Sequence, residues 1–192
     1  MLRENALKAL LNKHLCIEEV YTIFEHFKGD SGVEATIAMN LSLRTSVHNT
    51  SLEKSPTMSL LLEKLSTSED MSVRWAVAKN PHTPEAVLVH LSHDPINLVR
   101  ALVATNKTTP KPILQELFND EKIVRDGLSG NPSTPLKYLL ILCDDADAMV
   151  RLRVLENPSC TLSLCERLLN DEAPNVAQAA KITYQRLKNE LA

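Results

Sequence analysis

An internal repeat of 25 or 26 residues dominates this sequence. Four segments align without gaps, and each runs from a valine–arginine pair to an asparagine: 73–80, 99–106, 124–131 and 150–157. The closing asparagines are Asn80, Asn106, Asn131 and Asn157, which are 26, 25 and 26 residues apart. Periods of about 20–50 residues are typical of solenoids built from stacked helical or strand units, so this feature constrains the fold more than composition does.

Further positions agree downstream of each asparagine. Three of the four units continue with Thr-Pro, most then carry two leucines three residues apart, and all four have an aspartate 14 residues after the asparagine. These aspartates are Asp94, Asp120, Asp145 and Asp171. Valines four residues apart place the start of each unit on a first helix. We expect Thr as N-cap and Pro as first residue of a second element of about eight residues, α or 3-10. The aspartate then caps or precedes the next first helix.

The sequence therefore predicts an all-α fold, an α-solenoid of about six to seven helical repeats in a single domain, 1–192. Residues 1–68 are expected to form degenerate N-terminal repeats, 69–171 the regular repeats of roughly 25 residues, and 172–192 a C-terminal capping helix. Within the first part, helices are expected over 3–12 and 16–28, from 33 to about 47, and from Pro56 onward. Residues 29–32 read as a turn and 49–55 as a polar loop, and Arg44 falls near the position of the repeated arginine.

Composition argues against several other classes of protein. The net charge is −3 and no basic tail or half stands out, which disfavours a sequence-independent nucleic-acid clamp. The longest apolar run, 138–143, is far short of a membrane span, and the first residues lack a secretory pattern. The four cysteines, Cys16, Cys143, Cys160 and Cys165, have irregular spacing and do not suggest a disulfide framework. A reducing cytoplasm is the expected location.

The phrase V-R-x-x-V-A-x-N-P-x-T-P-x-x-x-L-x-x-L, best seen at 73–91, resembles the repeat of the bacterial leucine-rich repeat variant family. It is also similar to HEAT-type repeats in its Asp…Val-Arg opening. The match covers about 69–176 well and the first third poorly. The resemblance implies a right-handed superhelix and a general role in protein interaction. One branch of that family carries an iron–sulfur cluster on clustered N-terminal cysteines, but only Cys16 lies in the N-terminal half here, so no cofactor is expected.

The most ordered polar feature is the arginine column, defined as Arg74, Arg100, Arg125 and Arg151. Stacked units would align these residues along one face, where they could bind phosphate, nucleic acid or an acidic peptide. Alternatively, each arginine binds an acidic or carbonyl group between units. We favour this structural role because every unit supplies its own acid. Asp94, Asp120 and Asp145 precede Arg100, Arg125 and Arg151 by six, five and six residues.

The two positions after each arginine vary between units. Solenoids place their binding surfaces on faces that the fold does not dictate, so these positions supply the candidate partner-binding residues. The candidates are Trp75, Leu102, Leu152 and Arg153. Trp75 is the only tryptophan, and tryptophan is frequent among interface hot spots. It could equally fill a gap left by the irregular preceding unit.

Other reactive side chains do not form a convincing constellation. His90, His93 and Asp94 have helical spacing, but further ligands at zinc-site spacing are missing, so no metal is expected. Cys160 and Cys165 stand at the Thr and Leu positions of the repeat and read as small substitutes for those residues. No glycine-rich phosphate loop is present. We predict no catalytic residue.

The leading hypothesis for function is a non-enzymatic scaffold that binds another protein or a peptide along a superhelical groove. The alternative is a nucleic-acid or phosphate binder that uses the arginine column together with Arg153, Lys107 and Lys111. An enzyme such as a helical-repeat DNA glycosylase would need a catalytic acid beside aromatic residues, and that combination is not visible. The sequence identifies neither the oligomeric state nor the partner, for which a toxin and an assembly client are two examples.

Overall fold

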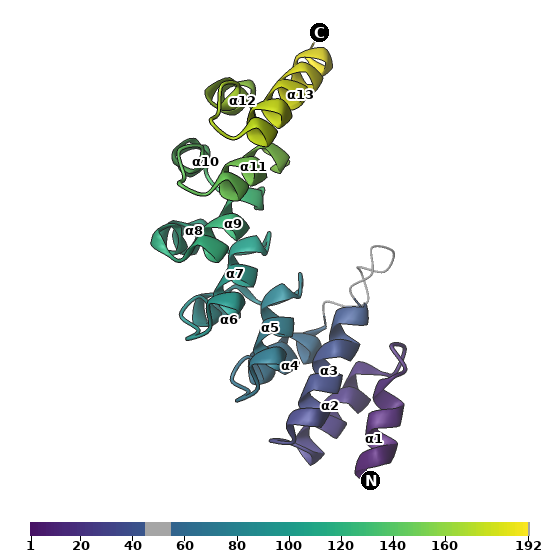
Figure 1. Ribbon diagram of the computed structural model, residues 1–192. Helices are drawn as coiled ribbons and strands as arrows, with labels where there is room; N and C mark the ends of the chain where they lie inside the picture. The colour runs from purple at the N-terminus through teal and green to yellow at the C-terminus, as the bar shows by residue number, and fades with distance from the viewer. Residues whose placement is uncertain (45–54, 192) are drawn as a thin grey trace. The chain divides into compact units, whose positions relative to one another are not determined.

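A computed structural model describes residues 1–44 and 55–191, and within these ranges the chain forms α-helices and one short 3-10 helix but no strand (Figure 1). The predicted all-α, helical-repeat class is confirmed. The helices are α1 (Arg3–Leu10), α2 (Ile17–His26), α3 (Ser31–Arg44), α4 (Pro56–Leu65), α5 (Met71–Lys79), α6 (Glu85–Leu91), α7 (Asn97–Thr105), α8 (Lys111–Glu116), η1 (Leu117–Asn119, 3-10), α9 (Lys122–Gly130), α10 (Leu136–Leu142), α11 (Ala148–Glu156), α12 (Leu162–Leu168) and α13 (Pro174–Glu190).

The chain divides into two compact units, residues 1–99 and 100–192. The boundary falls within α7, whereas the boundaries predicted at 68/69 and 171/172 follow the repeat pattern. A single domain over 1–192 stays a prediction. Odd-numbered helices are the first helices of the repeats, and even-numbered helices are the second helices.

In the unit formed by residues 1–99, first helices pack side by side. Helix α3 contacts both α1 and α5, while α2 and α4 contact each other and α3 (Figure 1). The valine positions at the start of the repeat point into this core, where Val33, Ile37 and Val73 are fully buried. Burying each such side chain stabilises the fold by about 1.5–3 kcal/mol.

The unit formed by residues 100–192 repeats this arrangement. Helix α11 contacts α9 and α13, and the second helices α10 and α12 pack against the first helices next to them in the chain (Figure 1). Val124, Val150 and Val176 are fully buried. Helix α13 lies within the predicted C-terminal segment 172–192, and only its Val176 and Ala180 are buried; a capping role for it stays a prediction. Of the helices in the described ranges, none combines the length and apolar character that a bilayer crossing demands.

The asparagines Asn131 and Asn157 each end a first helix and also bind the preceding repeat. The Oδ1 atom of Asn157 accepts the backbone N–H of Ser159, which closes the turn after the helix. Its Nδ2 group donates to the carbonyls of Ser129 (2.6 Å) and Asn131 (3.0 Å). Asn131 makes the equivalent contacts one repeat earlier, with the carbonyls of Ala104 and Asn106. The asparagine side chain therefore closes the end of its own first helix and binds the neighbouring repeat.

The repeated threonine does not cap the second helix, so that prediction is wrong. Pro84 occupies the N-cap position, with an extended ψ of 146°, and α6 begins one residue later. The Pro84 carbonyl is the first acceptor of α6, so the helix begins after the proline. The threonine before the proline therefore lies outside α6, near the end of the preceding first helix. The Thr83 hydroxyl donates to the Val77 carbonyl at 2.6 Å. Thr109 and Thr134 make the same bond in their own repeats.

Helix α3 departs from the sequence prediction at its N-terminal end and in its alignment with the repeat. It begins at Ser31, inside the predicted turn, because the Asp30 carboxylate accepts the Val33 N–H at 3.1 Å and caps the helix. The placement of Arg44 at the repeated arginine position is wrong. Val33, Ile37 and Asn40 have the spacing of Val73, Val77 and Asn80, so Glu34 takes that position.

Asn40 confirms this alignment, because its Nδ2 group donates to the carbonyls of Leu10 (2.6 Å) and Asn12 (3.1 Å), as the later asparagines do. Arg44 instead donates to Asn40 Oδ1. Of the predicted polar loop 49–55, residues 49–54 lie outside the described part of the chain. Ser55 is the N-cap of α4 and accepts the Met58 N–H at 3.1 Å.

Candidate partner-binding surface

Each residue of the arginine column forms a two-pronged ion pair with the aspartate 20 residues after it. Nε and Nη2 of the guanidinium donate to the two carboxylate oxygens. The Nε–Oδ2 distances are 2.6 Å for Arg74–Asp94, 2.7 Å for Arg100–Asp120, 2.6 Å for Arg125–Asp145 and 2.7 Å for Arg151–Asp171. The expected carboxylate partners, five or six residues before the arginine, are therefore wrong. The second helix runs back along the first and brings the later aspartate beside the arginine.

The aspartate that precedes an arginine contributes its backbone instead. Nη1 of Arg151 donates to the Asp145 carbonyl at 2.7 Å, and Nη1 of Arg125 donates to the Asp120 carbonyl at 3.0 Å. A side chain in the first turn of a helix leans toward the helix N-terminus, which places the guanidinium against the preceding turn. The guanidinium groups of Arg74, Arg125 and Arg151 thus each join the turn before the first helix to the turn after the second helix.

These pairs hold both partners in the charged state. Hydrogen bonds from Arg100 and Arg151 lower the pKa of Asp120 and Asp171. Around Asp94 burial acts to raise the carboxyl pKa, but the hydrogen bonds it accepts outweigh burial and the pKa is lowered overall. The side chains of Arg151 and Asp171 are only 6% and 5% exposed. The geometry supports the structural interpretation of the column, because the guanidinium donors face partners inside the fold.

Trp75 lies on the surface of α5, where 37% of it is exposed. It lines a pocket of about 440 Å³ whose walls come from α3 and α5. The other lining residues are Ala35, Met39, Ser42, Ser72, Ala76, Lys79 and Asn80. The ammonium group of Lys79 stands 5.1 Å from the centroid of the Trp75 ring, a cation–π contact. Trp75 therefore forms the wall of an open, mainly apolar hollow and does not plug a gap in the core.

Arg153 borders a smaller pocket of about 270 Å³ on α9 and α11. Its guanidinium pairs with Glu156 at 2.9 Å and with Asp126 at 3.8 Å. Gly127 lets α9 approach α7 closely, because a Cβ atom there would lie 2.8 Å from the Ala101 carbonyl oxygen. The surface around Arg153 is therefore polar and of mixed charge rather than basic.

The four candidate residues are divided between the two compact units. Trp75 belongs to the unit of residues 1–99, and the other three belong to the unit of residues 100–192. Leu102 on α7 and Leu152 on α11 are half-buried, and neither lines the pocket beside Arg153.

Sequence reasoning missed a set of exposed apolar residues on the first helices. Three of them directly precede a buried repeat valine: Leu98, Ile123 and Met149. Adjacent residues on a helix do not share a face, so an apolar residue next to a buried valine points away from the core. That rule was the available signal. Met39 on α3 and Ile182 on α13 belong to the same set, and both are more than half exposed.

The histidines and cysteines in the described part of the chain show no reactive arrangement. His93 Nδ1 lies 3.0 Å from the Val89 carbonyl, and the Asp94 carboxylate is bound by Arg74. Within 1–44 and 55–191, His, Cys, Asp and Glu side chains do not gather in threes that could hold a metal ion. The sulfurs of Cys160 and Cys165 are 3.7 Å apart in the core, where burial raises the pKa of Cys165 to about 12. A thiol with that pKa stays protonated and is a poor nucleophile.

Stacked helix pairs with an internal charge pair and a variable outer face define this chain as a helical-repeat protein. A family model described as leucine-rich repeat variant matches residues 72–96. A solved structure described as a leucine-rich repeat variant with a novel repetitive protein structural motif has a similar fold, with a TM-score of 0.52 and 22% sequence identity. The similarity covers 93% of this chain and 80% of that chain. A search of curated proteins finds no match. The predicted resemblance to the leucine-rich repeat variant family is confirmed.

Proposed function

We propose that this protein is a non-enzymatic scaffold that binds another protein or a peptide through the exposed face of its first helices. One observation carries the proposal: the ordered polar column is used inside the fold, whereas large apolar side chains such as Trp75, Ile123 and Met149 stay exposed on the first helices. Contiguous exposed apolar groups mark interaction sites more often than chance placement does.

The pocket beside Trp75 is the anchor point of this proposal. Its volume of about 440 Å³ falls in the range of small-molecule and side-chain pockets. Tryptophan supplies a large rigid contact area, and the flexible Met39 side chain can adapt to the shape of a partner. We expect an apolar side chain of the partner to enter this pocket, with an acidic neighbour facing Lys79.

Binding rather than catalysis is supported by the surroundings of the reactive side chains. The buried cysteines are protonated, and the aspartates of the repeat are held by arginines. We place the protein in the cytoplasm, because its four cysteines are free thiols and a reducing compartment keeps them so.

The test compares three forms of the chain in affinity capture from the native host with quantitative mass spectrometry. They are the wild type, Trp75→Ala and a matched control, Ile141→Ala, which removes an exposed apolar side chain from the second helix α10. We expect the Trp75→Ala form to lose a defined set of proteins at least roughly tenfold, as removal of a hot-spot tryptophan does. The control should retain that set, and the melting temperatures of all three forms should stay close.

Three outcomes would contradict the proposal. Equal capture by wild type and Trp75→Ala would remove the pocket from the interface. Enrichment that depends on nucleic acid and disappears after nuclease treatment would favour the alternative function, a nucleic-acid binder. A large drop in melting temperature for Trp75→Ala would assign the side chain to the core.

A further inference from the structure

The first full repeat, α3 with α4, has an acid where the other repeats have arginine. Glu34 follows Val33 as Arg74 follows Val73, and it is 92% buried, with 8% of its surface exposed. Ser68 stands three residues after Leu65, where Asp94 stands three residues after Leu91. The arginine–aspartate pair is thus replaced by glutamate and serine at the same two places of the repeat.

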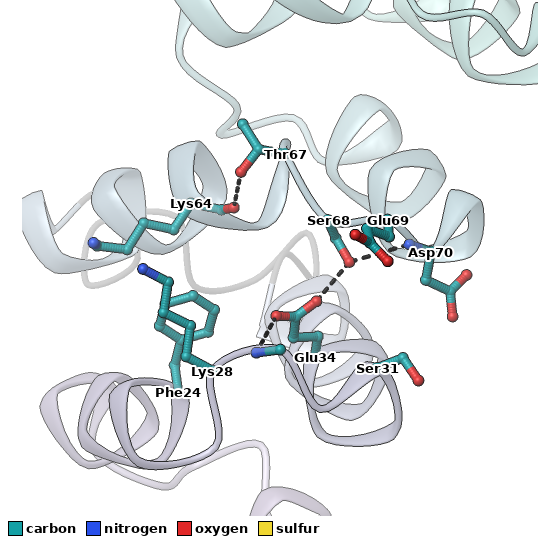
Figure 2. Close-up of a pocket in the computed structure, with 10 residues that line it drawn as sticks. Phe24, Lys28, Ser31, Glu34, Lys64, Thr67, Ser68, Glu69 and Asp70 are labelled. Carbon is teal, nitrogen blue, oxygen red and sulfur yellow. Dashed lines mark hydrogen bonds between the residues drawn. The ribbon is translucent and has the colours of Figure 1, made fainter.

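The replacement reverses the polarity of the contacts. Glu34 Oε1 accepts the N–H of Gly29 at 3.0 Å, and Oε2 accepts the Ser68 hydroxyl at 2.5 Å (Figure 2). Gly29 has a φ of +87°, a conformation that favours glycine, and so presents its N–H to the carboxylate. The carboxylate again joins the turn before the first helix to the turn after the second, but as an acceptor.

A glutamate side chain is shorter than arginine, and a pocket of about 470 Å³ opens beside it. The wall consists of Phe24, Lys28, Gly29, Ser31, Glu34, Lys64, Thr67, Ser68, Glu69 and Asp70 (Figure 2). The Arg74 guanidinium donates to the Ser68 carbonyl in the turn before α5 and to the Asp94 carboxylate in the turn after α6. The 68–70 turn therefore has this guanidinium on one side and the pocket on the other. The pocket therefore lies where the repeat elsewhere holds a guanidinium.

Charges of opposite sign occupy different parts of the pocket. Lys28 and Lys64 lie beside Phe24 (Figure 2). The pKa of the nearby Glu25 is lowered chiefly by a hydrogen bond from Tyr21 and further by both lysines, and the Lys64 ammonium is 3.4 Å from that carboxylate. Glu34 and Glu69 supply the acidic part. The Asp70 carboxylate is occupied by the backbone and hydroxyl of Ser72. A ligand that carries both a cation and an anion matches this arrangement.

We propose that this pocket binds an arginine that has a free carboxylate, with its guanidinium against Glu34 and Glu69 and its carboxylate against Lys28 and Lys64. Such a group is present in free L-arginine and at the C-terminus of a polypeptide that ends in arginine. Guanidinium–carboxylate pairs are strong because two charge-assisted hydrogen bonds form in parallel. The inference is independent of the binding face around Trp75.

The experiment titrates the full chain with L-arginine and follows binding by NMR chemical shifts and calorimetry. Parallel arms use L-citrulline, which lacks the cation, and L-arginine amide, which lacks the anion. We expect saturable binding of L-arginine and at least roughly tenfold weaker binding of both analogues, since each loses a charge-assisted contact. Nα-acetyl-L-arginine separates the two sources: retained affinity assigns the pocket to a chain terminus, and lost affinity assigns it to the free amino acid.

Two variants test the residues. Glu34→Gln and Lys28→Met should each weaken L-arginine binding at least roughly tenfold, whereas Lys188→Met, on α13, should not. Lys28 is exposed, so its variant stays informative if Glu34→Gln is destabilised. Absence of saturable binding up to about 10 mM, or equal binding of citrulline or of the amide, would overturn the proposal. These readouts do not involve partner capture, so they stand or fall separately from the proposed function.

Discussion

The first full repeat and the regular repeats solve the same structural problem with opposite charges. In the regular repeats an arginine joins two turns, as Arg151 does with Asp171. In the first repeat Glu34 joins the equivalent turns through Gly29 and Ser68. The asparagine, by contrast, is unchanged: Asn40 and Asn157 bind backbone carbonyls of the preceding helices in the same way.

The difference separates two kinds of constraint. The asparagine satisfies buried backbone carbonyls, and such groups are present whatever the side chains are. The position after the first valine needs only a polar group that reaches both turns. A buried ion pair is one solution, and a carboxylate with two neutral donors is another. We therefore expect the regular repeats to depend on matched charges and the first repeat to tolerate loss of charge.

The largest expected effect comes from breaking the most buried pair. Arg151→Leu leaves the Asp171 carboxylate buried without its cation, and we expect the free energy of unfolding to fall by roughly 3–5 kcal/mol. Urea denaturation followed by circular dichroism measures this loss. The double variant Arg151→Leu/Asp171→Leu should recover most of it.

Glu34→Gln is the matching change in the first repeat, and it should reduce stability by less than about 1 kcal/mol. Glutamine keeps an acceptor for Gly29 and can donate to the Ser68 hydroxyl. Equal losses for Glu34→Gln and Arg151→Leu would show that the comparison between the two repeats is wrong.

The third prediction concerns the asparagine that both regions share. Asn157→Ala and Asn40→Ala should each reduce the free energy of unfolding by roughly 2–3 kcal/mol, because each strands two backbone carbonyls. The same urea titration measures both. A large loss at one position and none at the other would contradict a common role in the two regions.

Lowering the pH should reduce the free energy of unfolding, by a smaller amount for each arginine–aspartate pair. The pKa of Asp171 is lowered by hydrogen bonds from Arg151, so its contribution to stability is fully present above the unfolded pKa of about 3.9. That contribution disappears as the pH falls through the lower, folded-state pKa. Stability measured from pH 6 down to about pH 3 should therefore decline. The decline should be shallower in the Arg151→Leu/Asp171→Leu variant, and an unchanged slope would argue against the pair.

The smallest expected effects concern the hydrogen bond from the repeated threonine hydroxyl to a carbonyl of the first helix. Thr134→Val removes the hydrogen bond to the Leu128 carbonyl (2.8 Å) and should cost about 1 kcal/mol. In the next repeat Cys160 takes the threonine position and its sulfur contacts Cys165 instead. Cys160→Thr should therefore raise the melting temperature slightly, and differential scanning fluorimetry of both variants checks the opposite signs. A lower melting temperature for Cys160→Thr would mean that the contact between the two sulfurs stabilises the fold more than the restored threonine hydrogen bond does.

The periodic parts of the fold were predictable because their period is visible in the chain. Regular spacing of Val, Asn and Leu places the helices, and the adjacent-residue rule exposes Ile123 and Met149. The partner of each arginine was not predictable from proximity in sequence. It depends on where the second helix returns, which brings Asp171 to Arg151 from 20 residues away.

The first repeat was harder to recognise for a related reason. Asn40 is followed by further helical residues rather than by proline, and α3 continues to Arg44. The interval to Asn80 is also much longer than the regular period. The pocket beside Glu34 follows from a side chain that is too short for its place, and only packing reveals such a mismatch. Trp75 could be chosen from sequence as an interface residue, but its hollow depends on how α3 lies against α5.

Asn131 and Asn157 bind backbone carbonyls of the preceding repeat, and this choice of acceptor affects how easily repeats can be gained or lost. A peptide oxygen is supplied by any amino acid, so the joint between modules makes no demand on the neighbour's composition. Arg125 and Asp145, in turn, lie 20 residues apart and are inherited together when a stretch of 25 or 26 residues is copied. Duplication or deletion of one repeat in the gene would therefore preserve the contacts between the remaining repeats. The outer surface could then diversify without changes to the buried residues.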